Sequence, residues 1–492
     1  MTTRSIWEGT AAANLQFPSL RGEAKADVVI IGGGITGLTA AMLLSEAGKK
    51  VIVLEALQVG KGTTGNSTGN LYVTVDEHLS GIRKKWSTEV MRTVVQSREA
   101  AIDLIENRIK KYSLQCDFFR TGFNYFSEKL EREAQDFIQK ESEAIADAGL
   151  IPNITENPPL PFPVKKMLSV EGQAQFHPLK YAQELAKALQ KNCIIHEHSK
   201  VIDYNEDEGT VRTGEGTVKA DHIIMATHTP KGVFALHMQL GPYREHGVAA
   251  KLSSGSCPQG IFWGIEDPKH SVRAYKDHVM VIGDKFKTGT IDDNFEYING
   301  LKKYLRDRFE TEEISYVWGG QQYRPADALP YIGKHGKRMY ILTGFATDGL
   351  VYGTLGAMII ADQVLGKKNP FEKIYDAGRS TPMRSAGEFI KENAGAFAEY
   401  VKDMPWNVDE HSIKEIKPGE GKIIGKEGEK VAVYKDETGK AHIVSAVCTH
   451  MKCIVNWNNA EKTWDCPCHG SRFGIDGKVL EGPAIHDLPN KK

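Results

Sequence analysis

The sequence predicts an α/β protein that carries a small all-β domain at its C-terminal end. Three observations support this fold class. Within residues 26–54, an apolar run, a glycine-rich turn, a helix-like stretch and a second apolar run follow one another. Helix and strand patterns then alternate as far as about residue 365, and from about residue 411 short strand-like runs alternate with glycine-containing turns. The first pattern is typical of a βαβ unit in a parallel sheet, and the last is typical of a small β domain.

The βαβ unit is the clearest element. Residues 26–31 (ADVVII) are apolar and adjoin a glycine turn, which predicts a buried parallel strand. Residues 38–47 have helical composition and end at Gly48, and the second strand, 51–54, closes with Glu55.

The remaining elements follow from spacing and from breaker residues. We expect helices over about 90–109, 130–149, 179–190 and 350–365, and strands over about 193–203, 222–225 and 339–342. We also expect β structure over 248–284, with a hairpin of 271–275 and 279–283 that turns at Asp277 and His278. Residues 60–70 should have no regular structure, and residues 157–163 should form a proline-rich linker.

Composition excludes several classes of protein. The 492 residues have a formal net charge of −1, which argues against nucleic-acid binding, because binders of nucleic acid normally show a basic excess. The 25% charged and 41% hydrophobic fractions argue against a disordered or fibrous chain. The N-terminal residues lack a signal-peptide pattern, and the uncharged stretch 28–44 is short for a membrane span. We therefore expect a cytoplasmic protein without a transmembrane segment, and leave peripheral contact with a membrane open.

The glycine turn has the spacing of a dinucleotide-binding loop. Gly32, Gly34 and Gly37 form G-x-G-x-x-G between the strand and the helix. The first glycine allows the tight turn, the second lets a pyrophosphate approach the backbone, and the third lets the helix pack on the strand. Glu55 lies 18 residues beyond Gly37, where a carboxylate can accept hydrogen bonds from a ribose. A plain tight turn is the alternative, but the strand before the loop, the helix after it and the position of Glu55 together favour dinucleotide binding.

The body of the chain resembles the D-amino-acid oxidase and glycine oxidase superfamily of FAD enzymes. The resemblance rests on the glycine motif and on four further segments: 60–70 after the acid, 219–227 (KADHIIMAT), 323–333 (YRPADALPYIG) and 344–350 (GFATDGL). It implies that FAD, rather than NAD, is the cofactor. The implied FAD-binding residues are Gly32, Gly34, Ile35, Thr36, Gly37, Glu55, Thr63, Thr64, Asn66, Val201, Ala226, Thr227, Gly344, Thr347, Asp348, Gly349 and Leu350.

Arg324 has two interpretations. In amino-acid-oxidising relatives the matching arginine holds the substrate carboxylate, a role that suits its bidentate guanidinium group. The alternative is a salt bridge to Asp327.

The strongest motif lies near the C-terminus. Cys448-x-His450 is followed by Cys466-x-x-His469, so two loops each supply one thiol and one imidazole. A Rieske [2Fe–2S] cluster needs two cysteines on one iron and two histidines on the other. A structural zinc site uses the same four atoms, although zinc fingers rarely show this spacing.

The flanking residues resemble Rieske proteins. They read C-T-H-x-x-C and C-P-C-H-G-S. This resemblance implies a disulfide bond between Cys453 and Cys468, and it implies that His450 and His469 lie near the surface, where an electron acceptor would make contact.

Together these motifs predict three parts: an FAD-dependent oxidoreductase body over 1–370, a partly helical linker over 371–405 and a Rieske domain over 406–492. Within the body we expect FAD-binding parts at about 25–80, 165–235 and 316–370, and substrate-domain parts at about 85–164 and 236–315.

The predicted function is that of a dehydrogenase. It would oxidise a small organic substrate, an amine, amino acid or hydroxy acid, and pass electrons one at a time from flavin to cluster and on to an acceptor, either a protein or a quinone. A redox sensor or electron-transfer protein with little turnover is the alternative. A Rieske oxygenase is disfavoured, because the sequence shows no clustered pair of histidines with a nearby acid for a mononuclear iron.

Overall fold

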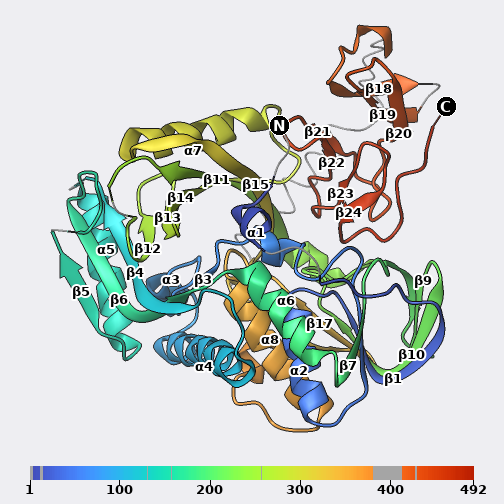
Figure 1. The fold of residues 1–492 in the computed structure, drawn as a ribbon, viewed down its shortest axis with the longest axis horizontal. Helices are drawn as coiled ribbons and strands as arrows, with labels where there is room; N and C mark the ends of the chain where they lie inside the picture. Colours follow the sequence, from blue (N-terminus) through green and yellow to red (C-terminus); the bar gives the residue numbers. More distant parts are fainter. Residues whose placement is uncertain are drawn as a thin grey trace.

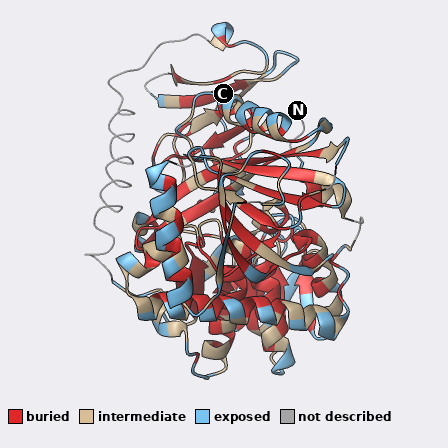
Figure 2. Cartoon of the chain, turned by 90° about the vertical axis from the view of Figure 1, so that its left-hand side faces the viewer, coloured by how far each residue is buried: buried red, intermediate tan, exposed pale blue. Residues whose placement is uncertain are grey.

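The computed structural model describes residues 4–11, 15–129, 131–156, 158–255, 257–380, 413–426 and 429–491. Two large sheets form the body of the protein, and the C-terminal β domain lies beside the strands β11 (Leu240–Leu252) and β15 (Thr311–Pro325) (Figure 1). Buried residues run through the strands and the inner faces of the helices, and exposed residues lie mainly on the outer helix faces (Figure 2).

The first sheet is the predicted α/β element. Its strand order is β16 (Tyr331–His335), β17 (Met339–Thr343), β10 (Gly216–Met225), β1 (Gly22–Ile31), β2 (Val51–Leu54) and β7 (Cys193–His196), with β9 (Thr210–Thr213) paired to β10 and β8 (Val201–Asn205) paired to β9. The five strands from β17 to β7 are parallel. This arrangement confirms the α/β class.

Helices cover one face of this sheet. They are α2 (Ile35–Glu46), α4 (Thr88–Tyr112), α6 (Pro178–Leu189) and α8 (Gly349–Val364). Along β1, Val28 and Ile30 belong to the core beneath these helices, whereas Val29 and Ile31 belong to the core on the opposite face. Successive side chains of a strand point to opposite faces, so a strand buried on both faces is apolar throughout.

The second sheet is mixed and has nine strands. Its order is β15, β11, β14 (His278–Lys287), β13 (His270–Tyr275), β12 (Ile261–Gly264), β4 (Phe119–Ser127), β6 (Lys166–Gln175) and β3 (Asn70–Leu71), with β5 (Pro152–Thr155) paired to β6. Helix α7 (Asn294–Arg308) packs on one face through Ile298, Leu301 and Leu305. The remaining helical elements of the body are α1 (Ile6–Thr10), η1 (Thr63–Asn66), α3 (Leu79–Lys85), α5 (Arg132–Asp147), η2 (Ala235–Gln239) and α9 (Glu372–Tyr375).

The C-terminal domain is all β, as predicted. It contains a three-stranded sheet of β18 (Gly421–Lys426), β19 (Glu429–Lys435) and β20 (Ala441–Ser445), preceded by η3 (Ile413–Glu415). A four-stranded sheet of β21 (Asn456–Asn458), β22 (Thr463–Asp465), β23 (Arg472–Phe473) and β24 (Val479–Glu481) follows. Its core surrounds Trp464 and Phe473, which are fully buried.

Several local predictions need correction. Residues 60–70 contain the 3₁₀ helix η1, and the strand expected over 193–203 divides into β7 and β8 around His198, whose φ is 51°. The hairpin turns at Lys276 and Asp277, one residue earlier than predicted, because Lys276 takes the left-handed conformation with φ 54°. Of the predicted linker, α9 is helical, and the part from residue 381 lies outside the described residues.

Among the helices that the structure describes, none combines the length and the apolar character that crossing a membrane requires.

Candidate redox site

The glycine loop connects β1 to α2 in a geometry that only glycine fits at two positions. Gly32 has φ +113°, a conformation that other residues rarely adopt. A Cβ atom at Gly37 would lie 2.0 Å from the carbonyl oxygen of Gly32, so a side chain would force the helix away from the strand. The first turn of α2, which no side chain caps at Gly34, therefore lies directly over the end of β1.

Glu55 lies at the end of β2, beside this loop. Its carboxylate accepts hydrogen bonds from the backbone N–H groups of Gly33 (2.7 Å) and Leu57 (2.8 Å). Burial raises the pKa of Glu55, and the two N–H groups act in the opposite direction. The carboxylate is thus held in place at the wall of a cavity.

The cavity has a volume of about 510 Å³ and passes from the glycine loop to the sheet formed by β11 and β15. The predicted FAD residues that line it are Gly32, Gly34, Ile35, Thr36, Glu55, Thr63, Thr64, Asn66, Val201, Ala226, Thr227, Thr347, Gly349 and Leu350. Three others lie behind its wall. Gly37 packs on Gly32, Gly344 packs near Leu240 and Pro325, and Asp348 pairs with Arg98 at 3.4 Å.

The shape of the cavity fits an extended dinucleotide. Gly62 and Gly349 both line it, and a Cβ atom at either glycine would meet no described atom within 4 Å. Gly349 begins α8, whose first N–H groups have no side-chain cap, so the positive end of that helix faces the space. The N-terminus of α2, where Ile35 N donates to Thr64 Oγ1 (3.1 Å), lies on the same cavity. Two helix N-termini on one cavity suit a ligand that carries negative charge at two places.

Arg324 lies outside the cavity lining. Its guanidinium group pairs with Asp76 at 3.1 Å and with Glu77 at 3.4 Å. Asp327, the partner in the alternative interpretation, pairs with Arg379 at 2.9 Å, and a salt bridge between Arg324 and Asp327 stays a prediction. Binding of a substrate carboxylate by Arg324 stays a prediction, and it would require Asp76 and Glu77 to give way.

The two cysteine loops of the C-terminal domain meet at one point. Backbone hydrogen bonds close each loop, from Cys448 N to Cys453 O (2.8 Å) and from Cys466 N to Ser471 O (2.8 Å). Cys453 and Cys468 are joined by a disulfide bond across the loops, whereas Cys448 and Cys466 are free, buried and in contact with each other. The sulfur of Cys466 also lies within 4.8 Å of the two disulfide sulfurs, but a disulfide leaves those two sulfurs unable to bind iron as thiolates.

The two histidines complete a donor set beside the free thiols. The rings of His450 and His469 lie 5.0 Å apart between centroids, and the Nδ1 atom of each is buried without a hydrogen-bond partner among the described residues. Two free thiols and two open imidazole nitrogens match the ligands of a Rieske cluster.

A histidine of the body, His237, forms a hydrogen bond with the ring of His450. His237, in η2, lies with Nε2 3.2 Å from the carbonyl oxygen of Pro230 and with Nδ1 3.1 Å from Nε2 of His450. Because a carbonyl can only accept, His237 donates through Nε2, and burial lowers its pKa to about 3, which keeps the ring neutral. His450 therefore donates from Nε2, and its Nδ1 is left free of a proton and able to bind a metal.

The position of these rings corrects one expectation. His450 and His469 are 8% and 9% exposed, since the body of the protein covers them. An acceptor cannot contact the two rings in this arrangement, and the surface they face belongs to the body.

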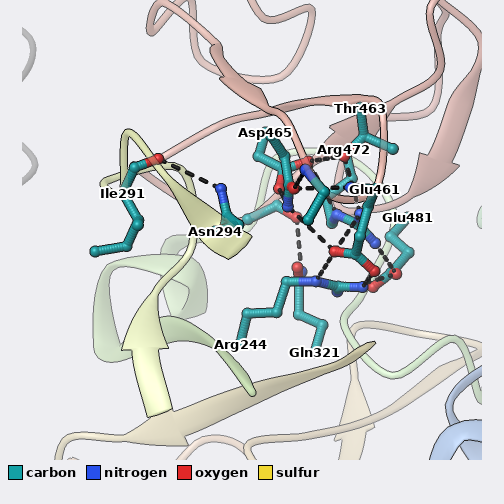
Figure 3. Close-up of polar contacts among 12 residues, drawn as sticks. Arg244, Ile291, Asn294, Gln321, Glu461, Thr463, Asp465, Arg472 and Glu481 are labelled. Atoms are coloured by element: carbon teal, nitrogen blue, oxygen red, sulfur yellow. Dashed lines mark hydrogen bonds and ion pairs between the residues drawn. The ribbon is translucent and has the colours of Figure 1, made fainter. Parts of the chain in front are cut away.

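A buried network of charges joins the two domains (Figure 3). Arg244 on β11 pairs with Glu461 of the C-terminal domain, and Arg472 pairs with Glu461 (3.0 Å), Asp465 (2.9 Å) and Glu481 (2.7 Å). Burial alone would raise the pKa of Glu461, but the two guanidinium groups together lower it well below its usual range. We call these five residues the interface network.

Backbone contacts bring the second cysteine loop onto the same sheet. Gln321 donates to the carbonyl oxygen of Gly470 (2.6 Å), and Tyr323 donates to that of Gly482 (2.8 Å). A Cβ atom at Gly470 would lie 2.6 Å from the Cβ atom of Pro242, so glycine permits this close approach. Residues 479–482, together with Ala484 and Ile485, also line the cavity.

Sequence reasoning missed the residues that join the domains. His237 and Arg244 carry no local motif, and their partners lie more than 200 residues away in the chain. The alternation of β11 and β15 was the available signal, since it places Arg244, Gln321 and Tyr323 on one face of the sheet.

A dinucleotide cavity that is closed in part by a domain bringing together two free thiols and two imidazoles indicates an oxidoreductase with its own iron–sulfur domain. Comparisons with known proteins support this class. The family model of FAD dependent oxidoreductases (DAO) matches residues 27–363, and that of the Rieske [2Fe-2S] domain matches residues 406–492. The chain belongs to the FAD dependent oxidoreductase family and ends in a Rieske domain; its cofactors are FAD and a [2Fe–2S] cluster.

Individual relatives share one or both parts. The Rieske 2Fe-2S iron-sulfur protein YhfW of Bacillus subtilis (strain 168) is 30% identical over 96% of this chain and 94% of its own length. Gamma-glutamylputrescine oxidoreductase of Escherichia coli (strain K12) is 25% identical over 75% of this chain and 91% of its own length. Glycine oxidase from Geobacillus kaustophilus superposes with a TM-score of 0.60 at 19% identity, covering 73% of this chain and all of that structure, which shows that the two share a fold.

Replacing His237 by Phe is expected to raise the reduction potential of the cluster. The hydrogen bond from His450 to His237 makes the imidazole more electron-rich, which favours the oxidised cluster. Its loss, about 1 kcal/mol, corresponds to about 40 mV for one electron. A redox titration followed by electron paramagnetic resonance measures the change. His222→Phe, which removes a ring that contacts Tyr340 in the body, is the control; an unchanged potential in His237→Phe would contradict the expectation.

Proposed function

We propose that this protein is an FAD-dependent dehydrogenase that oxidises a small organic substrate and exports the electrons one at a time through its Rieske cluster to an acceptor. The substrate is an amine, an amino acid or a hydroxy acid. FAD accepts two electrons as a hydride, and the cluster carries one electron at a time. The pair thus converts a two-electron oxidation into single-electron steps.

One observation carries this proposal: a single cavity is lined by residues of both domains. Gly34 and Thr64 line it from the dinucleotide side, Gln321 lines it from the sheet, and Leu480 and Gly482 line it from the Rieske domain. Gln321 also donates to Gly470, the residue next to His469. Gln321 therefore connects the wall of the cavity directly to the loop that carries His469.

The roles of the residues follow from their positions. In this proposal, the N-terminus of α2 with Gly32 and Gly34 holds the pyrophosphate, Glu55 binds the ribose, and the N-terminus of α8 faces the flavin and stabilises negative charge. Cys448 and Cys466 would hold one iron of the cluster, and His450 and His469 would hold the other.

The direction of electron flow follows from potentials. Rieske clusters lie between about −150 and +300 mV, usually above a protein-bound flavin. Each 100 mV of difference contributes about 2.3 kcal/mol per electron. His450 and His469 face the body of the protein, so a cluster held by these two rings would receive its electrons from the side that the body covers.

An anaerobic substrate screen tests the proposal. The holoenzyme is mixed with amines, amino acids and hydroxy acids while the flavin and cluster absorbance bands are followed. We expect the flavin to be reduced first and the cluster second. A cluster that stays oxidised beside reduced flavin would refute electron export, and a flavin that no compound reduces would favour a redox sensor.

A further inference from the structure

The two faces of the β11–β15 ribbon have different partners. On one face, Arg244 contacts the Rieske domain, as do Gln321 and Tyr323. Glu245 and Gln322 belong to the opposite face, because successive residues of a strand alternate. Both side chains line the cavity.

This second face carries polar groups that the described residues leave unsatisfied. Gln322 is 3% exposed, and neither its amide nitrogen nor its amide oxygen has a hydrogen-bond partner among those residues. Glu245 forms no hydrogen bond or salt bridge with another described residue, and the residue opposite it on β15 is Gly320, which has no side chain. Buried polar groups in this state are costly, so a ligand that pairs with them would be bound favourably.

The cationic side chains beside this face are paired with carboxylates, so the charge that the face itself presents to the cavity is that of Glu245. Arg324 is held by Asp76 and Glu77, and Lys285 is held by Asp76 at 3.1 Å. The cationic side chains that do line the cavity come from other segments: Lys61, Lys200, Lys231 and Arg472.

The surroundings of Glu245 agree with this assignment. Burial raises the pKa of Glu245 to about 7; Lys285 opposes this rise, and Asp76 and Asp348 add to it. A cationic ligand beside Glu245 would offset the cost of burying the carboxylate.

We propose that Glu245 and Gln322 form the substrate subsite and that it selects amines by their ammonium group, rather than α-amino acids by their carboxylate. This inference rests on the proposed function, since it places the substrate in the cavity that the flavin shares. Glu245 pairs with the nitrogen of the substrate, and Gln322 supplies a donor and an acceptor beside it.

Binding of a compound that cannot be oxidised tests the subsite. tert-Butylamine has no hydrogen on the carbon that bears nitrogen, and pivalate has the same shape with a carboxylate in place of the ammonium. Each is titrated into the oxidised holoenzyme, and binding is measured by calorimetry and by the shift of the flavin absorbance. We expect tert-butylammonium to bind more tightly than pivalate, and E245Q to weaken it roughly tenfold or more, the factor expected for a hydrogen bond between charged partners.

Matched variants separate the subsite from general damage. E312Q changes an exposed glutamate on β15 and should leave the affinity unchanged. Gln322→Leu keeps the volume and should weaken binding severalfold while the flavin and cluster spectra stay intact. Tighter binding of pivalate, or equal affinities in wild type and E245Q, would overturn the subsite.

Failure of the subsite differs from failure of the proposed function. Glu245-dependent binding of tert-butylammonium without flavin reduction by any amine would support the subsite and contradict the dehydrogenase. Flavin reduction by n-butylamine with an unchanged half-saturating concentration in E245Q would overturn the subsite and support the dehydrogenase.

Discussion

Replacing Arg244 by Met is expected to slow electron transfer from flavin to cluster by about tenfold or more while substrate still reduces the flavin at the wild-type rate. Arg244 is the member of the interface network that the body contributes, and its side chain is only 3% exposed. Breaking a buried ion pair costs about 3–5 kcal/mol. Glu461 keeps Arg472 as a partner, so the Rieske domain itself stays intact and the loss falls on its contact with the body.

Rapid mixing with a reducing substrate measures both steps in one experiment, because flavin and cluster absorb at different wavelengths. Arg212→Met is the matched control: its pair with Asp203 is exposed, and exposed pairs contribute only about 0–1 kcal/mol. If Arg244→Met transferred electrons to the cluster as fast as wild type, the interface network would have no part in transfer. If flavin reduction fell equally, the substitution would have damaged the body instead.

The fold could be predicted from the sequence wherever it depends on interactions within a short segment of the chain. Residues 28–31 and 51–54 are apolar on both faces because parallel strands are buried on both faces, and Gly32 and Gly37 mark a turn that other residues cannot make. The four cluster candidates were equally visible, since Cys448, His450, Cys466 and His469 lie in two short loops whose spacing reflects the ligand set.

Contacts between distant segments could not be predicted in this way. Arg324 lies in a recognisable motif, yet its partner Asp76 lies 248 residues earlier, and no periodicity links the two. The same holds for His237 and His450: the burial of a cluster ligand depends on how two domains dock, and a single strand pattern carries no information about that. In the sequence, Glu245 likewise looks like an ordinary strand residue, and only the folded structure places it at the cavity wall.

Replacing Cys466 by Ala is expected to remove the cluster and to stop electron export, while FAD remains bound and substrate still reduces it. Cys466 is a free buried thiol, and the Cys453–Cys468 disulfide leaves no thiolate in the second cysteine loop to take its place. Thiolate ligation contributes to folding as well as to metal affinity, so the Rieske domain should also unfold at a lower temperature. The glycine loop and Glu55 lie in the other domain, which is why flavin content should stay at the wild-type level.

Iron, sulfide and flavin analysis measures each cofactor separately, and Cys193→Ala, which removes a free buried cysteine from β7, should keep all three. Full iron and sulfide in Cys466→Ala would show that the cluster is held elsewhere, whereas loss of flavin along with the cluster would show that the cavity depends on a folded Rieske domain to close it.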